Sequence, residues 1–472
     1  MAQIIETVAE IRLSAQDVEP LADELKAYQA IYQEYFCRIE QQRQAQSYLE
    51  GLMQALPNKS IERIVLHNQG DDVNAIRAMQ HFMSEGAWQD GPILKRHWQE
   101  VDQEIGNEAG VVIVDGSGFP KQGDASVGVK RQWCGQLGKV DNCQVGVFLG
   151  YASQQGYTLL DRRLYLPAEW VLDEAYADRR DKCGVPDDIT FKTKPELALE
   201  MVKAVADSGQ LRFRWLTCDE EFGRDPAFLD QVGHYGWYLA EVSPDTSVWL
   251  ERALTWVPPW SGKGRKPTRE RLVAGQPAAQ SVAAVVATLP ASAWSRHSIK
   301  EGTKGPLVAD CVAIRVINVR DGLPGLALWL ICRRDVFTHE IKYFFSNAPL
   351  ETPLTTFVWL TGMRWPIESC FEDGKQELGL GDYQLRSWRG WHHHMTLAIL
   401  AHFFLVRVQR RMQPKVPHLT LPQAILLLKA VLPQPKVDLE TTVEIINYYQ
   451  RRHAAAYRSH RKRRLDKLHQ LE

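Results

Sequence analysis

The run VVIVDGSGFPKQG, residues 111–123, opens on four β-branched residues that end at Asp115. A short and wholly apolar run of this kind is expected of a central strand that is buried on both faces. A carboxylate at the end of a buried strand is poorly solvated by bulk water, so it needs a partner or a metal ion. This stretch therefore predicts a buried strand that ends in an acidic side chain.

The 130 residues that follow alternate between strand-like and helical patterns. In chain order these are CQVGVFLGY (143–151), YTLLDRRLYL (157–166), a helical segment from Pro195 to Gly209, FRWLTCD (213–219), a short helical stretch from Asp225, and GWYLAEV (236–242). Proline near the start and glycine at the end are typical helix boundaries. Three strands, a helix, a strand and a helix form the ordered core of the ribonuclease H-like fold. The predicted fold class is therefore α/β, with a ribonuclease H-like mixed sheet.

The segments on either side of this core have other patterns. Residues before the core show apolar positions at three- and four-residue steps from Leu21 to Ile39, which predicts helices. Runs such as VADCVAIRVINV and GLALWLICRR predict an inserted, mostly β subdomain. The predicted segments are a helical N-terminal domain (1–105), the first part of the core (106–242), a β-rich insertion (243–350), the helical part of the core (351–412) and a helical C-terminal region with a basic tail (413–472).

Charge is distributed unevenly along the chain, although its formal net charge is only −1. The segment 451–467 carries eight Lys or Arg against the single Asp466. The loop SGKGRKPTRER, residues 261–271, has five basic residues, among them Lys263, Arg265 and Lys266, against one acid. Each segment is either a solvated surface or a contact for nucleic acid, and the sequence leaves both interpretations open.

Cysteine usage and hydropathy exclude several classes of protein. The eight cysteines include no CxxC pair, which argues against a zinc site or a disulfide framework. The N-terminus lacks the basic region and apolar core of a signal peptide. The longest apolar stretch, Leu397 to Val406, is too short to span a bilayer, which needs about 20 residues. We expect a cytoplasmic protein with reduced thiols and no membrane partner.

Three acidic residues occupy positions that suit a metal-dependent catalytic site. Asp115 and Asp219 each end a strand-like run, and Glu368 follows Pro366 by two residues, in the first turn of a predicted helix. Three converging carboxylates repel one another unless cations lie between them. Mg²⁺ suits such a site because it takes carboxylate oxygens and retains water, and a pair of such ions supports phosphodiester cleavage and transfer. We expect Mn²⁺ to substitute for Mg²⁺.

Two basic residues flank the same glutamate. Arg364 precedes Glu368 by four residues, and Lys375 follows it by seven, on the same helical face. We expect both to contact DNA phosphates beside the scissile bond, because phosphate contacts fix the register of a strand. The alternative is that they only neutralise Glu372 and Asp373.

The chain resembles a known family, the DDE-type insertion-sequence transposases of the DDE superfamily endonuclease group. The matching motifs are VVIVDGSGFPKQG (111–123), WLTCDEEFGRD (215–225) and MRWPIESCFEDGKQELGLGDYQLRSWRGWHHH (363–394). The last of these resembles the family's Tyr-Arg-Glu-Lys motif through Arg364, Glu368 and Lys375. Thr361 stands where the family has tyrosine, which puts in doubt the contact that the tyrosine would make.

The resemblance implies an activity and its partners. It implies a transposase that cuts transposon-end DNA and joins it to target DNA, with Asp115, Asp219 and Glu368 as catalytic and metal-binding residues. It also implies a homodimer on paired DNA ends in a bacterial cytoplasm, associated with the nucleoid when bound to DNA. The helices of residues 1–105 suit a helix-turn-helix DNA reader or a plain bundle, and this domain is our candidate for DNA binding.

Other functions remain as alternatives to a transposase. The same acids would serve a stand-alone metal-dependent endonuclease, and a catalytically inactive DNA-binding derivative is a further alternative. A two-carboxylate glycosidase fits less well, because basic residues surround Glu368.

GFPKQGD (118–124) lacks the Lys-Ser/Thr pair of a phosphate-binding loop. Adjacent helical residues face different directions, so His392, His393 and His394 are not expected to share a metal. The tryptophans at 249, 256 and 260 are expected to be core residues rather than platforms for a flipped base.

Overall fold

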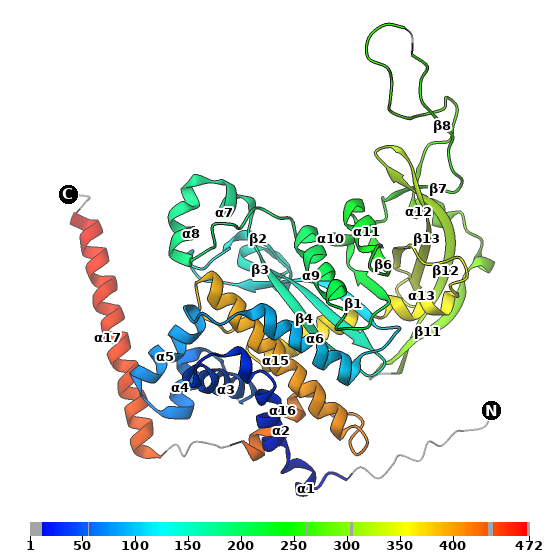
Figure 1. Cartoon of the computed structure of the whole chain (residues 1–472). Coiled ribbons are helices and arrows are strands. Elements are labelled where there is room, and N and C mark those ends of the chain that lie inside the picture. Colours follow the sequence, from blue (N-terminus) through cyan, green and yellow to red (C-terminus); the bar gives the residue numbers. More distant parts are fainter. Residues whose placement is uncertain (1–11, 55, 261, 303–304, 433–437, 470–472) are drawn as a thin grey trace.

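The computed structural model describes residues 12–54, 56–260, 262–302, 305–432 and 438–469 (Figure 1). Within these residues the protein is a mixed α/β structure, with one large mixed sheet in the middle of the sequence and helices at both ends. No helix in these ranges is long and apolar enough to cross a membrane.

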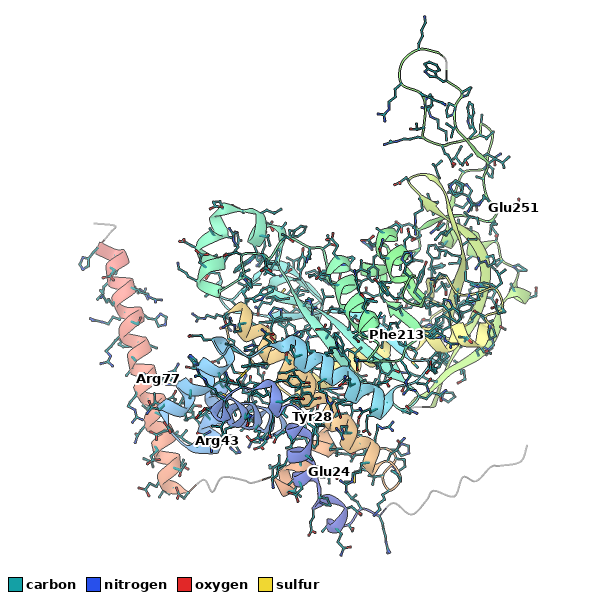
Figure 2. The ribbon with its side chains drawn as sticks, viewed as in Figure 1. Glu24, Tyr28, Arg43, Arg77, Phe213 and Glu251 are labelled. Atoms are coloured by element: carbon teal, nitrogen blue, oxygen red, sulfur yellow. The ribbon has the colours of Figure 1, made fainter. Side chains whose placement is uncertain are left out.

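The N-terminal part of the described chain is helical, as its periodicity predicts. Its helices are α1 (Ala15–Val18), α2 (Leu21–Ala30), α3 (Ile39–Met53), α4 (Ile61–Gln69), α5 (Val73–Ser84) and α6 (Asp90–Ile105). Helices α2, α3, α5 and α6 pack against α15 (Trp388–Met412), which lies far away in the sequence, and α4 packs against α3 and α5. Tyr28 of α2, for example, donates a hydrogen bond of 2.9 Å from its hydroxyl to the carbonyl oxygen of Leu400 (Figure 2). The N-terminal helices are therefore continuous with the core of the protein.

Five strands at the centre of the sheet reproduce the predicted order of elements. They are β1 (Val111–Pro120), β3 (Lys139–Ser153), β4 (Gly156–Tyr165), β5 (Trp215–Cys218) and β6 (Trp237–Val242). In space they follow the order β4-β3-β1-β5-β6. The pairs β1–β3 and β3–β4 are antiparallel, whereas β5 lies parallel to β1 and β6 lies parallel to β5. The parallel pairs need crossovers, and helices supply them: α9 (Lys194–Ser208) precedes β5, and α10 (Glu220–Gly223) and α11 (Pro226–Val232) precede β6.

The β-rich segment extends this sheet. Its strands are β7 (Ser247–Trp249), β8 (Thr255–Trp256), β9 (Arg271–Leu272), β10 (Gln280–Ser281), β11 (Ser295–Gly302), β12 (Gly305–Arg320), β13 (Leu323–Asp335) and β14 (Ile341–Ser346). Because β14 pairs with β6, the sheet of the described chain grows to twelve strands, with β2 (Lys130–Cys134) beyond β3. A separate two-stranded sheet, β8 with β9, lies in an arm that projects beyond Glu251 (Figure 2).

The remaining helices cover the sheet or follow it. They are α7 (Ala168–Leu172), α8 (Ala177–Cys183), α12 (Val282–Ala287), α13 (Leu354–Thr361), α14 (Trp365–Glu377), α16 (Leu421–Val431) and α17 (Leu439–His469). Most of α15 is apolar and buried around its whole circumference, as expected of a helix at the centre of a core. Each fully buried side chain such as Phe403 or Leu405 contributes roughly 1.5–3 kcal/mol to folding.

The three adjacent histidines of α15 are part of this core. The ring of His392 bonds to the carbonyl oxygen of Trp388, that of His393 to Met83 and Trp88, and that of His394 to Tyr48 and Leu380. Burial lowers the pKa of all three, that of His394 to about 3, so they are neutral. Within the described chain the three rings thus bond to separate partners in the core.

The tryptophans of the insertion differ from the expectation. Trp249 is buried and donates its indole N–H to the carbonyl oxygen of Pro277 at 2.9 Å. Trp256 and Trp260 are 46% and 52% exposed, so the expectation of a core role is wrong for these two. They lie on the projecting arm, where no neighbouring element of the described sheet covers them.

Candidate active site

The central strands place the first two predicted acids side by side. Val114 of β1 lies opposite Cys218 of the parallel strand β5. The next residues, Asp115 and Asp219, therefore lie side by side where the pairing of β1 with β5 stops. Asp219 follows the end of β5 as predicted, but the prediction that Asp115 ends its strand is wrong, because β1 continues to Pro120 through its pairing with β3. Asp115 is 8% exposed and accepts a 2.7 Å hydrogen bond from the backbone N–H of Gly116.

Asp219 also caps the start of a helix. It is the N-cap of α10, and its carboxylate accepts hydrogen bonds from the backbone N–H groups of Glu221 at 3.0 Å and Phe222 at 3.4 Å. An acid at this position compensates the unpaired N–H groups of the helix start. These two bonds use one oxygen, Oδ1, and leave Oδ2 for a second interaction.

The third acid comes from a distant helix. Glu368 lies in the first turn of α14, where Pro366 occupies one of the first two positions, as expected. Its side chain is 45% exposed. The positive end of the helix dipole stabilises the ionised carboxylate there.

Arg364 joins these acids. It is the N-cap residue of α14, and its Nη1 lies 3.1 Å from Oδ2 of Asp115. Its Nη2 contacts Oε1 of Glu368, and its Nε lies 3.9 Å from Oε2 of Glu241. The sequence predicted a DNA phosphate as the partner of this residue. In the structure the guanidinium instead lies among carboxylates, and a planar fork with five donors is suited to bridge several of them.

Glu241 was not predicted from the sequence. It lies on β6, one strand beyond β5, and Lys342 of β14 holds its Oε1 at 2.9 Å. The available signal was an acid inside the otherwise apolar run GWYLAEV. Because β6 continues the parallel order β1-β5-β6, that acid reaches the same end of the sheet as Asp115 and Asp219.

Mutual repulsion and burial shape the electrostatics of the site. Burial, followed by the negative charge of Asp219, raises the pKa of Asp115 to about 7 against the opposing effect of Arg364. Burial and then Glu221 raise the pKa of Asp219 as well. The single guanidinium therefore does not compensate the cluster fully, and a further cation would stabilise it.

The donor set suits a hard divalent cation. Three carboxylates supply the oxygen ligands that Mg²⁺ prefers, and burial followed by the charge of Asp219 raises the pKa of Asp115 even beside Arg364. Within the described residues, however, no group of three or more His, Cys, Asp or Glu side chains is arranged to hold a metal ion. Arg364 lies between Asp115 and Glu368 and accounts for this, since it contacts both carboxylates itself.

We expect Asp115→Asn to stabilise the metal-free protein at alkaline pH. A free Asp titrates near pH 3.9 and the folded one near 7. Between these values the folded state binds more protons, so stability falls as pH rises. Above pH 7 the ionised side chain costs up to about 4 kcal/mol, which asparagine avoids. Urea unfolding in chelator should show the variant more stable than the parent at pH 8 and by much less at pH 5. An equal difference at both pH values would contradict this assignment.

Lys375 contacts β1, whereas the basic loop that contains Lys263 lies on the projecting arm. Lys375 reaches back to β1, where its Nζ donates a 3.1 Å hydrogen bond to the carbonyl oxygen of Gly118 and lies 5.1 Å from the ring centre of Phe119. It does not pair with Glu372 or Asp373 in any hydrogen bond or ion pair of the described chain. Lys263, Arg265 and Lys266 are exposed on the arm between β8 and β9. The structure thus brings Arg364 to the acids and places the basic loop apart from them on the arm.

Thr361, at the position where the related motif has tyrosine, is buried near the end of α13. Its hydroxyl donates to the carbonyl oxygen of Val358 at 2.7 Å, and its own carbonyl oxygen accepts from Nη1 of Arg333 at 2.8 Å. The residue therefore supports the helix end and contacts none of the three acids in the described structure.

Comparisons with known proteins agree with this arrangement. A family model described as DDE superfamily endonuclease matches residues 32–306, which is more than half of the chain and includes Asp115 and Asp219. The probable transposase for insertion sequence element IS701 from Microchaete diplosiphon is 27% identical over 148 residues, 31% of this chain and 35% of that protein. The matched region thus spans about a third of that relative's length. The family match itself is sufficient to conclude that the chain belongs to the DDE superfamily endonucleases.

Proposed function

We propose that this protein is a transposase that cleaves transposon-end DNA and transfers the cut strand to target DNA. The observation that carries the proposal is that Arg364 contacts both Asp115 and Glu368, while Asp219 lies beside Asp115 on the neighbouring parallel strand, close enough for their charges to interact. Family membership supports the nuclease chemistry, and the similarity to an insertion-sequence transposase supports the transposition step.

The proposal includes a ribonuclease H-like catalytic core. Its support is the strand order β4-β3-β1-β5-β6, with the first three strands antiparallel and the last two parallel to β1. We propose that residues 106–242 and 351–412 form this core, that residues 243–350 form an insertion that continues its sheet, and that residues 413–472 form a C-terminal region. The insertion lies between the second acid and the third, so its arm can contribute to DNA binding without interrupting the strands that carry the acids.

The three acids would hold the metal. Asp115, Asp219 and Glu368 offer carboxylate oxygens, and bound Mg²⁺ or Mn²⁺ would supply charge stabilisation and activation of the attacking oxygen in phosphodiester cleavage. Three elements position these side chains: β1 and β5 hold the two aspartates, and the first turn of α14 holds the glutamate. Glu241 is placed to accept the guanidinium of Arg364 when that group leaves Asp115.

We propose that Arg364 and Lys375 position the DNA strand. An arriving phosphate can compete for the guanidinium, because arginine binds phosphate and carboxylate with the same planar fork. An ammonium has three N–H donors, so the bond from Lys375 to Gly118 still allows a phosphate contact. Lys263, Arg265 and Lys266 are proposed to contact DNA from the arm, where all three are exposed.

The N-terminal helices are proposed as a further DNA-binding domain, residues 1–105. Helices α4 and α5 are joined by a short turn at Gly70, whose φ of 71° favours glycine. Two consecutive helices with a short glycine-containing turn match the helix-turn-helix arrangement. We propose that the active assembly is a homodimer on two DNA ends, in the cytoplasm.

The decisive test uses DNA that carries the ends of the element. We expect purified protein with Mg²⁺ to nick labelled end DNA and to give products joined to a second, unlabelled duplex. Matched DNA with a scrambled end is the control. Cleavage without joined products would favour a stand-alone endonuclease, and binding without cleavage would identify an inactive derivative.

A further inference from the structure

The last helix of the chain carries an unusual density of positive charge. Helix α17 spans Leu439–His469, and its part from Arg451 to Lys467 contains eight Lys or Arg against one acid. Every side chain whose exposure is described from Arg451 to His469 is exposed. The whole protein has a formal net charge of −1, so this cationic segment is a local feature of the chain.

The first half of α17 contacts the N-terminal helices. Tyr448 is 4% exposed in the described structure, and two ion pairs follow it. Arg451 lies 2.9 Å from Asp71 in the turn between α4 and α5, and Arg452 lies 2.7 Å from Glu62 of α4. These contacts attach the helix to the proposed helix-turn-helix pair. Beyond Arg452 the helix runs past α4 and α5 (Figure 1).

The second half of α17 is mostly polar, and its large apolar side chains are not packed in the described structure: Tyr457, Leu465 and Leu468 are 68%, 40% and 52% exposed. Arg458, Arg461 and Arg464 follow one another at three-residue steps, and Lys462 lies four residues after Arg458. Like charges at these spacings face each other and destabilise an isolated helix. Because its apolar side chains are exposed, this half gains little from packing in the described structure, and a polyanion that neutralises its basic side chains would stabilise it.

We propose that the second half of α17 lies against the phosphate backbone of duplex DNA, beside the α4–α5 pair. The choice of DNA rests on the proposed function, and charge complementarity supports it, because duplex DNA carries one charge per 1.7 Å or so of its axis. A second copy of the helix is a poorer partner. Exposed apolar residues lie in both halves of α17, but pairing the second halves of parallel helices would also bring their arginines together, which like-charge repulsion opposes.

The test measures binding to a duplex of 40 base pairs that lacks transposon ends, in chelator, over a range of KCl. The variant replaces Arg458, Arg461, Arg463 and Arg464 with glutamine. One side of a helix presents about half of them to a duplex, and each phosphate contact contributes about 0.9 to the salt slope. We expect the slope of log K against log salt to fall by about 2, with binding roughly 60-fold weaker at 0.1 M salt.

A matched control removes the same charge elsewhere. Replacing Lys26, Lys95, Lys182 and Lys203 with glutamine changes four exposed helical positions, and we expect the parental salt slope. Thermal unfolding should be the same in both variants and the parent. An unchanged slope in the arginine variant would overturn the proposal, as would a change of oligomeric state in sedimentation with unchanged binding. The assay needs no cleavage, so a protein that binds this duplex through α17 but never cuts end DNA would refute only the proposed function.

Discussion

Asp115→Asn, Asp219→Asn and Glu368→Gln should each reduce cleavage of end DNA by about 100- to 1000-fold, whereas binding to the same DNA should stay within a few-fold. The loss is large because each variant removes one ligand oxygen and one negative charge from a site that must hold charge in a fixed geometry. Removing one preorganised electrostatic group from an active site typically costs about 10²- to 10³-fold in rate. The measurement is a single-turnover cleavage assay with Mg²⁺ at pH 8.

The control for this series lies on the same helix as Glu368. Glu372 is exposed and bonds only to Gln376 among the hydrogen bonds of the described chain, so Glu372→Gln should cleave at the parental rate. If one of the three variants kept near-parental cleavage, that residue would be misassigned. Glu241 would then be the first substitute to test, because it already contacts Arg364.

The core strands could be predicted because their signals are local, whereas the end of β1 could not, since its pairing with β3 carries the strand past Asp115 to Pro120. The run VVIV predicts a buried strand whatever surrounds it, and β1 begins at Val111 as expected. Likewise α9 ends where glycine predicts, at Gly209 in a left-handed conformation. The convergence of Asp115 and Asp219 follows from parallel pairing of the two strands, which the order of elements already implied.

The contacts of Arg364 could not be predicted in the same way. Its spacing to Glu368 is visible in the sequence, but Asp115 is 249 residues away and Glu241 is 123 residues away. Only the packing of α14 on the sheet decides which of several acids an arginine meets. The insertion illustrates the same limit. Its strands are recognisable from β-branched runs, but whether they extend the core sheet depends on the pairing of β14 with β6.

Excess chelator should abolish cleavage, and Mg²⁺ or Mn²⁺ should restore it. The reason is that the ionised acids are poorly stabilised without a metal: burial and then the charge of Asp219 raise the pKa of Asp115 to about 7 even with Arg364 in place. Ca²⁺ should permit DNA binding but support little cleavage, because its looser coordination fixes the reacting oxygens less strictly. The measurement is cleavage in chelator after addition of each ion. Full activity in chelator would refute the metal requirement.

A variant of Arg364 tests metal binding by the acids in a measurement that does not depend on cleavage. Its guanidinium contacts both Asp115 and Glu368, so it competes with any cation for these carboxylates. Arg364→Gln should therefore bind Mn²⁺ more tightly than the parent in calorimetry, even though it loses cleavage because its contact to DNA is gone. Lys342→Gln is the matched control, since it removes a positive charge that contacts Glu241 but none of the three acids. If Arg364→Gln bound Mn²⁺ no better than the parent, the arginine would be a structural partner of the carboxylates rather than a substitute for the metal charge.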